Sequence, residues 1–429
     1  MAGDWKEFQF SELCDITRGA SPRPIHDWIS QTGTPWVKIS DATASGSRFI
    51  TRTGECIKNE ARERSVVVHE GDLILSNSAT PGIPKFMGIE ACIHDGWLLL
   101  RNLRGLDKLY AFYVLLRDRP RLVEQGNGSV FTNLKTEILK THRVAIPPLA
   151  EQKTIAAVLG ALDDKIELNR RMNATLEAMA RALFHSWFVD FDPVRAKLDG
   201  RKPIGLDETT AALFPDSFQE SSLGHVPKGW AVKPLSELCQ LGRGASPRPI
   251  NDFMNGEVPW VKIADATAAG GPFLFATKEK VKKAGAEKSV AVAPGDLILS
   301  NSATCGVPMF VELHGCIHDG WLYFKNLRSI SKLYLFHVLI ELAEHLVHIA
   351  DGSVQKNLNT NLVGQQVVLV PPKEIVDAFD SQATVWFAKM RQNGLESRTL
   401  AILRDTLLTK LLSGELQVAD VASKTATHL

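Results

Sequence analysis

Apolar residues recur at alternating steps of four and three residues in two segments of the chain, and this spacing predicts one stripe along a long helix. In the first segment, Gly160 is the only helix-breaking residue between Pro147–Pro148 and Asp192–Pro193. Its stripe consists of Ile155, Leu159, Leu162, Ile166, Asn169, Asn173, Leu176, Ala180, Leu183 and Trp187. The equivalent positions of the second segment form a weaker stripe: Phe379, Ala383, Trp386, Met390, Asn393, Ser397, Leu400, Arg404, Leu407 and Leu411. Such stripes require a partner, so we expect the two helices to pair as a coiled coil.

Polar residues in both stripes bear on how the helices pair. Asn169 and Asn173 lie in the first stripe, and Asn393 and Ser397 occupy the matching places in the second. In an antiparallel pair, Asn169 faces Ser397 and Asn173 faces Asn393, which satisfies hydrogen bonds and disfavours slipped registers. Parallel pairing also matches polar with polar, and separate helices packed on their own domains are a further alternative. Length favours the antiparallel pair, because a helix of about 38 residues spans roughly 57 Å at about 1.5 Å per residue and can hold two domains apart.

The sequence ahead of each helix has a shorter, mixed pattern. Residues 65–68, the turn residues 69–72 and residues 73–75 predict strand, tight turn and strand. Residues 97–100 predict another strand, and residues 108–116 have helical spacing. This segment therefore predicts a compact α+β domain.

The mixed pattern occurs twice. GDLILSNSAT occupies residues 71–80 and returns unchanged at 295–304. Other motifs repeat with it: RGASPRPI at 18–25 and 243–250, PWVKI at 35–39 and 259–263, and IHDGWL at 93–98 and 317–322. A solenoid would need more and shorter repeats. The chain is therefore predicted to be an α+β tandem duplication, in which a long helix follows each domain and the helices form an antiparallel coiled coil with pseudo-twofold symmetry.

The repeats and breakers set the expected boundaries. They are mixed domains at 1–148 and 230–372, helices at 149–190 and 373–416, a connector at 191–229 and a tail at 417–429. The connector contains Asp192–Pro193, Lys202–Pro203, Pro215 and Gly224. These residues predict an irregular segment.

Composition excludes some classes of protein. The chain has 429 residues, 45% of them apolar, which is enough for two or more domains with sizeable cores. Lys and Arg total 49 and Asp and Glu total 48, so a nucleic-acid partner must be bound by local positive patches.

The first ten residues lack the apolar core of a secretion signal, and no apolar run approaches the roughly 20 residues of a membrane span. The six cysteines form no C-x-x-C pair and are expected to be buried, reduced thiols of a cytosolic protein.

The chain lacks recognisable catalytic motifs. It has no N-P-P-[FY] or D-P-P-Y loop of an amino-methyltransferase, and no G-x-x-x-x-G-K-[ST] phosphate loop. His94–Asp95 and His318–Asp319 raise the question of a metal site, but each supplies two ligands at most and no further cluster has ligand spacing. We therefore expect no catalytic residues and no metal. Two similar domains related by a twofold axis suit a twofold target such as duplex DNA.

These features together resemble the specificity subunit of type I restriction–modification systems. The strongest local matches are IPPLAEQKTIAAVL at 146–159 and LLSGEL at 411–416, and the repeated GDLILSNSAT and GWL resemble the family's target-recognition domains. The resemblance implies that each mixed domain recognises one half of a bipartite DNA site. It also implies that the helices set the spacing and bind two modification (methyltransferase) subunits, which restriction subunits then join. S-adenosylmethionine, ATP and Mg²⁺ are expected on those partners, and the complex is expected in the cytoplasm.

Candidate DNA contacts are polar residues in the repeated loops. Arg18, Arg23, Arg243 and Arg248 can grip phosphate or bind guanine, unless they pair with a nearby acid such as Asp27 or Asp252. Short polar side chains can bond to bases or phosphates, or cap local turns. These are Ser76, Asn77, Ser78, Asn127, Ser129, Asn133, Ser300, Asn301, Ser302, Ser353 and Asn357. Lys38 and Lys262 are candidate phosphate contacts, whereas the run Lys278, Lys280, Lys282 and Lys283 is more typical of a solvated face.

The repeated loop residues are the same in both domains, so we expect two similar, inverted half-sites and a nearly palindromic target. Two alternatives remain open at this point. One is a two-headed scaffold for a protein or another ligand, which the near-neutral charge permits. The other is an autonomous enzyme with an unrecognised site, which the missing motifs disfavour.

Overall fold

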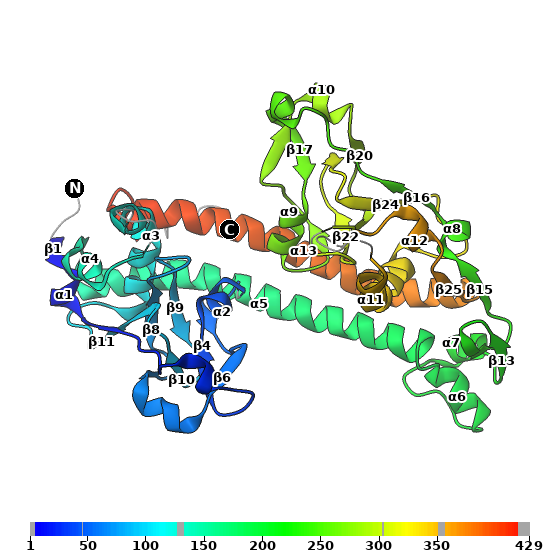
Figure 1. Cartoon of the computed structure of the whole chain (residues 1–429), viewed down its shortest axis with the longest axis horizontal. Helices are drawn as coiled ribbons and strands as arrows, with labels where there is room; N and C mark the ends of the chain where they lie inside the picture. Colours follow the sequence, from blue (N-terminus) through cyan, green and yellow to red (C-terminus); the bar gives the residue numbers. More distant parts are fainter. Residues whose placement is uncertain (1–4, 45, 127–132, 303, 351–356, 419–429) are drawn as a thin grey trace. The chain divides into compact units, whose positions relative to one another are not determined.

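The chain forms two compact units, each of which contains one mixed domain (Figure 1). The computed structural model describes residues 5–44, 46–126, 133–302, 304–350 and 357–418. Unit 1 comprises Met1–Glu167 and Arg398–Leu429, and unit 2 comprises Leu168–Ser397. Helix α5 extends over Leu149–Phe188 and helix α13 over Lys373–Leu412, each starting directly after a proline pair. Each unit thus contains one half of each long helix.

Unit 1 contains two five-stranded mixed sheets. The inner sheet has, in spatial order, β2 (Asp15–Arg18), β11 (Trp97–Arg101), β8 (Leu73–Ser76), β9 (Pro84–Met87) and β5 (Phe49–Ile50). The outer sheet has β3 (Ile29–Ser30), β6 (Glu55–Ile57), β4 (Thr34–Val37), β10 (Ala91–Ile93) and β7 (Val66–Val68). A separate antiparallel pair joins β1 (Lys6–Gln9) to β12 (Arg143–Ile146). The shorter helices of unit 1 are α1 (Phe10–Leu13), α2 (Ile39–Ala44), α3 (Lys108–Gly126) and α4 (Thr136–Thr141).

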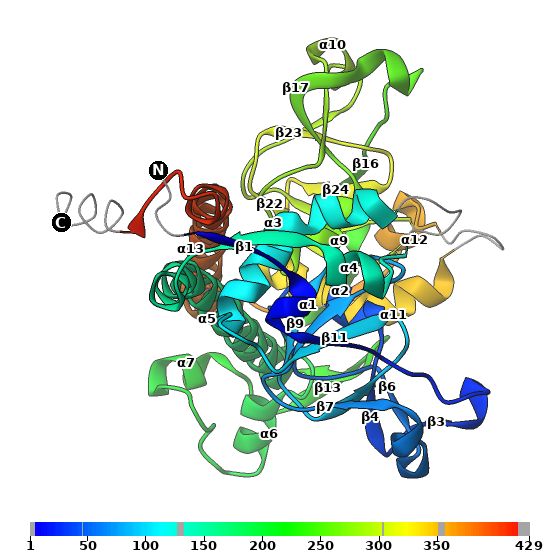
Figure 2. The ribbon, with the colours of Figure 1, turned by 90° about the vertical axis from the view of Figure 1, so that its left-hand side faces the viewer.

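Strand β8 explains why the repeated LIL segment is apolar throughout. Leu73 and Leu75 pack into a core with α3 and the ends of α5 and α13. These three helices are labelled in Figure 2. Ile74 points the other way, into a second core between the two sheets. The inner sheet is therefore buried on both faces, which requires apolar residues at successive positions. The predicted strand, turn and strand at 65–75 are present, but β7 and β8 belong to different sheets, and Gly71 adopts φ +82° in the turn between them.

Unit 2 repeats this architecture. Its inner sheet has β16 (Gln240–Arg243), β24 (Trp321–Lys325), β21 (Leu297–Ser300), β22 (Pro308–Val311) and β18 (Phe273–Leu274). Its outer sheet has β19 (Glu279–Val281), β17 (Met254–Val261), β23 (Gly315–Ile317) and β20 (Val290–Val292). β15 (Ala231–Pro234) pairs with β25 (Val367–Val370). The helices are α8 (Leu235–Leu238), α9 (Ile263–Ala269), α10 (Lys283–Ala286), α11 (Lys332–Ile349) and α12 (Thr360–Gly364).

The connector is ordered, so the prediction of an irregular segment was wrong. It contains α6 (Asp192–Leu198), α7 (Glu208–Leu213) and the hairpin of β13 (Phe218–Ser221) and β14 (Gly224–Pro227). Pro193 lies in the first turn of α6, where its missing N–H costs no hydrogen bond. Asp207 caps α7 by accepting from the Thr210 backbone N–H at 2.9 Å. Phe214 packs edge-on against Trp187 with ring centroids 5.1 Å apart, which fastens the segment to the core of unit 2.

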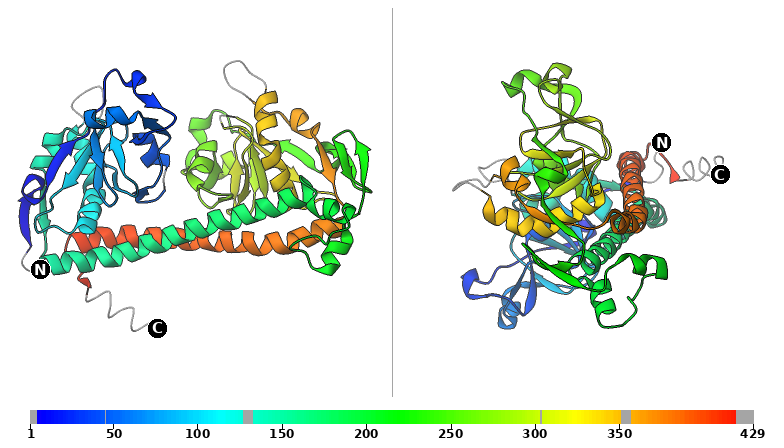
Figure 3. Two further views of the ribbon diagram at one scale, coloured as in Figure 1. Left: turned by 90° about the horizontal axis from the view of Figure 1, so that it is seen from below. Right: turned by 90° about the vertical axis from the view of Figure 1, so that its right-hand side faces the viewer.

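In unit 2 the long helices run antiparallel side by side (Figure 3). A layer of polar side chains joins them. Asn169 Nδ2 donates to Ser397 Oγ at 3.3 Å and to Glu396 Oε2 at 2.9 Å. Asn393 Nδ2 donates to Asn173 Oδ1 at 2.8 Å. Asn169 and Asn393 are buried, so an antiparallel pair shifted in register would leave these amides without partners. The facing pairs are those of the antiparallel register derived from the sequence.

Unit 1 holds its halves of the two helices together differently. Arg404 of α13 donates to Asp163 of α5 at 2.7 Å, and the Tyr113 hydroxyl of α3 donates to the same carboxylate at 2.6 Å. Arg404 therefore does not weaken the stripe but forms an interhelical ion pair within it. Both stripes, Arg404 included, consist only of buried or half-buried residues. No helix of the described residues is long and apolar enough to cross a bilayer.

Candidate nucleic-acid interface

A tight turn between β10 and β11 forms the base of the candidate site in unit 1. The Gly96 backbone N–H donates to His94 Nδ1 at 2.8 Å, and a Cβ at Gly96 would collide with the His94 ring. Trp97 Nε1 donates to the Val37 carbonyl at 3.2 Å, which fastens the turn to the outer sheet. Burial lowers the pKa of His94 below its ordinary value, so the ring is neutral at neutral pH and leaves the charge of the site to its neighbours.

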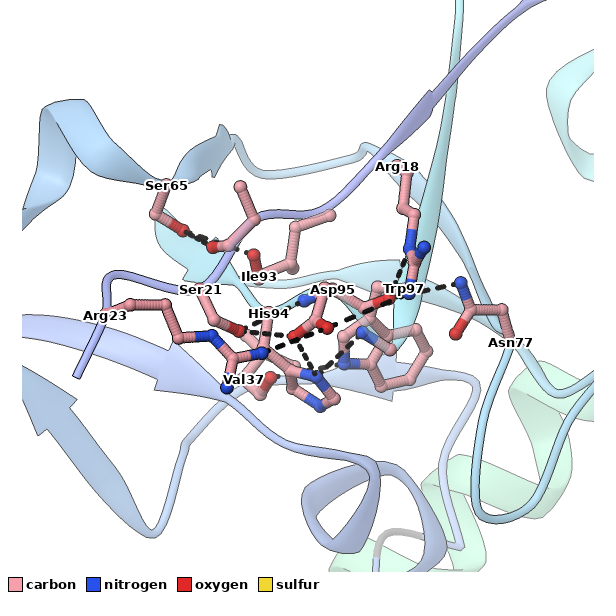
Figure 4. Close-up of polar contacts among 12 residues, drawn as sticks. Arg18, Ser21, Arg23, Val37, Ser65, Asn77, Ile93, His94, Asp95 and Trp97 are labelled. Atoms are coloured by element: carbon pink, nitrogen blue, oxygen red, sulfur yellow. Dashed lines mark hydrogen bonds and ion pairs between the residues drawn. The ribbon is translucent and has the colours of Figure 1, made fainter. Parts of the chain in front are cut away.

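Asp95, at the centre of this turn, holds the first repeated loop (Figure 4). Its backbone carbonyl accepts from Arg18 Nε at 2.9 Å and from Asn77 Nδ2 at 3.2 Å. Its carboxylate accepts from Ser21 Oγ at 2.5 Å, and its second oxygen lies 3.7 Å from Arg18 Nη2 and 3.5 Å from Arg23 Nη2. One aspartate thereby fixes two arginines on the same surface.

Unit 2 contains the same cluster. Asp319 accepts through its backbone carbonyl from Arg243 Nε at 2.7 Å and from Asn301 Nδ2 at 3.1 Å. Its carboxylate accepts from Ser246 Oγ and lies 3.9 Å from Arg243 Nη2 and 3.8 Å from Arg248 Nη2. We call these two sets the arginine clusters: Arg18, Ser21, Arg23, Asn77 and Asp95 in unit 1, and Arg243, Ser246, Arg248, Asn301 and Asp319 in unit 2.

The arginine clusters present positive charge to solvent. The Arg18 and Arg23 side chains are 59% and 73% exposed, and Asp95 is 40% exposed. Partial burial opposes ionisation of Asp95, but the hydrogen bond from Ser21 and the charge of Arg23 hold its pKa below the ordinary value. Each cluster therefore carries two cations and one anion at neutral pH. The ion pairs are long and exposed, so the guanidinium groups keep donors for a ligand.

The arginines pair with acids other than Asp27 and Asp252, the two examples considered from the sequence. Asp27 lies 3.1 Å from His26 Nε2. Asp95 and Asp319 hold the arginines instead, although they are distant in the sequence. Sequence reasoning placed both aspartates in a structural or DNA-facing turn without selecting them as contacts, and it did not consider Ser21 or Ser246. The signal was present, because IHDGWL and RGASPRPI repeat together.

Four of the serines and asparagines predicted to contact DNA are buried and stabilise the loops. Ser76 is completely buried; its hydroxyl donates to the Thr80 carbonyl at 2.7 Å and accepts from the Ile83 N–H at 2.8 Å. Ser300 is buried in the same way and bonds to Thr304 and Val307. Asn77 and Asn301 are also buried, with their amides on the cluster aspartates. The folded loops enclose all four side chains, and their contact with DNA stays a prediction.

The remaining candidates lie at or near the surface. Ser78 and Ser302 are half-buried, and Asn133 and Asn357 are exposed. Lys38 pairs with Glu55 at 2.5 Å and Lys262 with Glu279 at 2.7 Å, so both lysines have an internal partner. All four lysines of the basic run, Lys278, Lys280, Lys282 and Lys283, are exposed. Asn127, Ser129 and Ser353 lie outside the described residues.

All six cysteines are free thiols, as predicted, but one of them is less buried than expected. Cys14, Cys92, Cys239, Cys305 and Cys316 are buried and unbridged, whereas Cys56 is only half-buried. Burial raises the pKa of Cys14 to about 12 and that of Cys239 to about 11. Protonated thiols of this kind are poor nucleophiles. Among the described residues, no three His, Cys, Asp or Glu side chains gather as metal ligands would.

Comparisons with known proteins show the family to which the chain belongs. Residues 2–178 and 227–385 match the family described as type I restriction modification DNA specificity domain. The type I restriction enzyme HindI specificity subunit of Haemophilus influenzae is 26% identical over 474 residues, which cover 96% of this chain and 100% of the relative. The MjaIX specificity subunit of Methanocaldococcus jannaschii is 24% identical, with 97% and 95% covered.

A solved structure has the same fold. The type I restriction–modification S subunit from M. genitalium aligns with a TM-score of 0.56 and 14% identity, covering 95% of this chain and 96% of that chain. The family match occurs twice and spans more than half of the chain, as the internal duplication requires. The chain therefore belongs to the family of type I restriction–modification DNA specificity subunits, which are non-catalytic recognition subunits.

Proposed function

We propose that each unit recognises one half of a bipartite duplex DNA site through its arginine cluster. The supporting observation is that each unit has two exposed arginines paired with an equivalent aspartate, Asp95 in unit 1 and Asp319 in unit 2, at closely matching distances. Arginine side chains on loops can bind guanine or phosphate, and their exposure leaves them free to do so. The wild-type chain should bind duplex DNA with an affinity that falls steeply as salt rises.

The two half-sites should be similar and inverted. Identical clusters present identical donors and acceptors, so they favour the same bases on each side of an unrecognised spacer. Methylation mapping by long-read sequencing of DNA from cells carrying the complete system tests this proposal. A motif with two related, inverted halves is the expected result. Two unrelated half-sites would refute the near-palindromic target.

The paired helices should set the spacer and dock two modification subunits. Their continuous length and the buried polar layer at Asn169 and Asn393 suit a part that must keep one register. Deleting one heptad from each of α5 and α13 shortens each helix by about 10 Å. The spacer in the mapped motif should change, or methylation should be lost. An unchanged motif would count against this role.

The chemistry should reside on other subunits. We expect the modification subunits to supply S-adenosylmethionine, and the restriction subunits to supply ATP and Mg²⁺, in the cytoplasm. The purified chain alone should transfer no methyl group to DNA, and the chain together with modification subunits should methylate the mapped motif. Methyl transfer by the purified chain alone would overturn this division of labour.

A further inference from the structure

The aspartate in each arginine cluster restricts which part of DNA the arginines can meet. A phosphate brought against Arg18 and Arg23 also approaches the Asp95 carboxylate, whose second oxygen lies within 3.7 Å of both guanidinium groups. A phosphate and a carboxylate that bind the same guanidinium groups repel each other, and the repulsion grows as water is excluded. A base edge carries no net charge and meets no such penalty. The clusters are therefore poorly suited to phosphate and better suited to bases.

The cluster also offers complementary hydrogen-bonding groups. Arginine donates to O6 and N7 of guanine in the major groove, whereas a carboxylate accepts from the amino group of cytosine or adenine. Arg23 keeps donors for a ligand, since its side chain is 73% exposed and its contact with Asp95 is long, at 3.5 Å. The Asp95 carboxylate is 40% exposed beside it. One surface thus presents donors and an acceptor side by side.

The aspartate is held firmly enough to act as a template. Ser21 binds one carboxylate oxygen, and Arg18 and Asn77 bind the backbone carbonyl of the same residue. The turn beneath it has no space for a Cβ at Gly96, so the backbone has little freedom there. Such preorganisation reduces the entropy lost when side chains bind a base edge.

We propose that Asp95 and Asp319 are specificity-determining residues that direct the arginine clusters to base edges. The ligand of each cluster is a guanine beside an exocyclic amino group of cytosine or adenine, in equivalent positions of the two half-sites. This inference rests on the proposed DNA recognition. It goes beyond that proposal by assigning the clusters to bases instead of phosphates and by giving the acidic residues a role.

The test combines methylation mapping with binding to the mapped motif. Asp95→Asn, Asp319→Asn and the control Asp199→Asn each remove one negative charge. Asp199 is an exposed connector residue that pairs with Arg201 at 2.7 Å, so its substitution matches the charge change outside the clusters. Binding of the full chain is measured with a labelled duplex that contains the motif and with one in which one half-site is scrambled. The affinity ratio of the two duplexes is the specificity.

Asp95→Asn should relax one base position in one half-site, and Asp319→Asn the equivalent position in the other. Each should lower the affinity ratio about tenfold, in the range expected for one base contact, while affinity for the scrambled duplex rises. Asp199→Asn should change neither quantity. An equal rise in affinity for both duplexes, with an unchanged mapped motif, would overturn the inference.

A second variant covers the case in which an aspartate substitution unfolds its loop. Arg23→Ala removes an exposed side chain that supports no core residue, so the fold should persist. It should relax the same base position as Asp95→Asn with little change in the salt dependence. A uniform loss of affinity across sequences, with the salt slope reduced by about one, would identify Arg23 as a phosphate contact and refute the inference. If the wild-type system yields no bipartite motif, the proposed function itself fails, which is a separate outcome.

Discussion

The contacts of Asp163 allow a prediction that uses the second unit as a template. In unit 1 the Asp163 carboxylate accepts from Arg404 and Tyr113, and the Asp163 and Arg404 side chains are only 10% and 23% exposed. The equivalent positions of the duplicated sequence hold Phe387 for Asp163, Ala180 for Arg404 and His337 for Tyr113. The equivalent place in unit 2 has no carboxylate and lies in an aromatic core.

Removing one member of the polar set should cost more than replacing the set. Arg404→Ala leaves a buried carboxylate with only a hydroxyl partner, and breaking a buried ion pair in this way typically costs about 3–5 kcal/mol. The remaining solvent exposure of Arg404 places the expected loss near the lower end, at about 3 kcal/mol. The triple variant Tyr113→Phe, Asp163→Phe, Arg404→Ala removes the polar groups of these three side chains and makes the place more apolar, as it is in unit 2. It should lie within about 1.5 kcal/mol of the wild type.

Urea unfolding combined with hydrogen exchange over residues 149–167 and 398–412 measures these effects in unit 1. Arg404→Ala should lower protection in both segments, and the triple variant should restore most of it. Ile402→Ala, at a 66% exposed position on the same helix, is the control. If Arg404→Ala is as stable as the control, or if the triple variant is less stable than Arg404→Ala, the reasoning about buried charge at this site is wrong.

Three further predictions concern single residues. Burial opposes ionisation of Asp118, but hydrogen bonds from His142 and then Arg117 lower its pKa to about 2, so unit 1 should lose about 2 kcal/mol as pH falls from about 4 to 2. Urea titrations should show a shallower loss in Asp118→Asn, and an equal loss would contradict the assignment. Burial, and then the charge of Arg181, lower the pKa of His337 from 6.5 to about 4, so the unfolded state takes up the proton first and unit 2 should lose about 3 kcal/mol between these pH values. His337→Leu should remove that dependence, and a curve identical to the wild type would argue against it. Gly19→Ala places a Cβ against the His94 carbonyl and should destabilise unit 1 by about 1–3 kcal/mol in thermal unfolding, whereas Gly46→Ala has open space and should be neutral; equal effects would refute the packing argument.

The duplication, the two long helices and their facing polar residues could be predicted from the sequence because each rests on periodicity. Helical spacing repeats over many turns. Aligning the two stripes antiparallel is enough to predict which residues face Asn169 and Asn393. The order of the connector could not be predicted in this way. Its structure depends on single local contacts, such as the cap at Asp207 and the packing of Phe214, and it has no second copy for comparison.

The arginines of the candidate site could be selected from the sequence, but their aspartate partners could not. The arginines could be identified because charged residues in repeated loops are conspicuous. Their true partner, Asp95, is distant in the sequence, and a partner at that distance depends on sheet topology. Ser76 and Asn77 resembled surface residues because they are polar and follow a strand, yet folding turns both inward to satisfy backbone groups.

Unit 1 consists of two segments from opposite ends of the sequence, and this has a consequence for its folding during synthesis on the ribosome. Leu408, Leu411 and Leu412 complete the core formed by the N-terminal domain, although the whole of unit 2 lies between them and that domain in the sequence. At about 5–20 residues per second, translation of that interval takes on the order of 10–50 s. During this time the first domain must wait with apolar surface uncovered, whereas unit 2 already has every residue of its own. Loss of the last helical turns of a nascent chain would therefore damage the domain that emerged first.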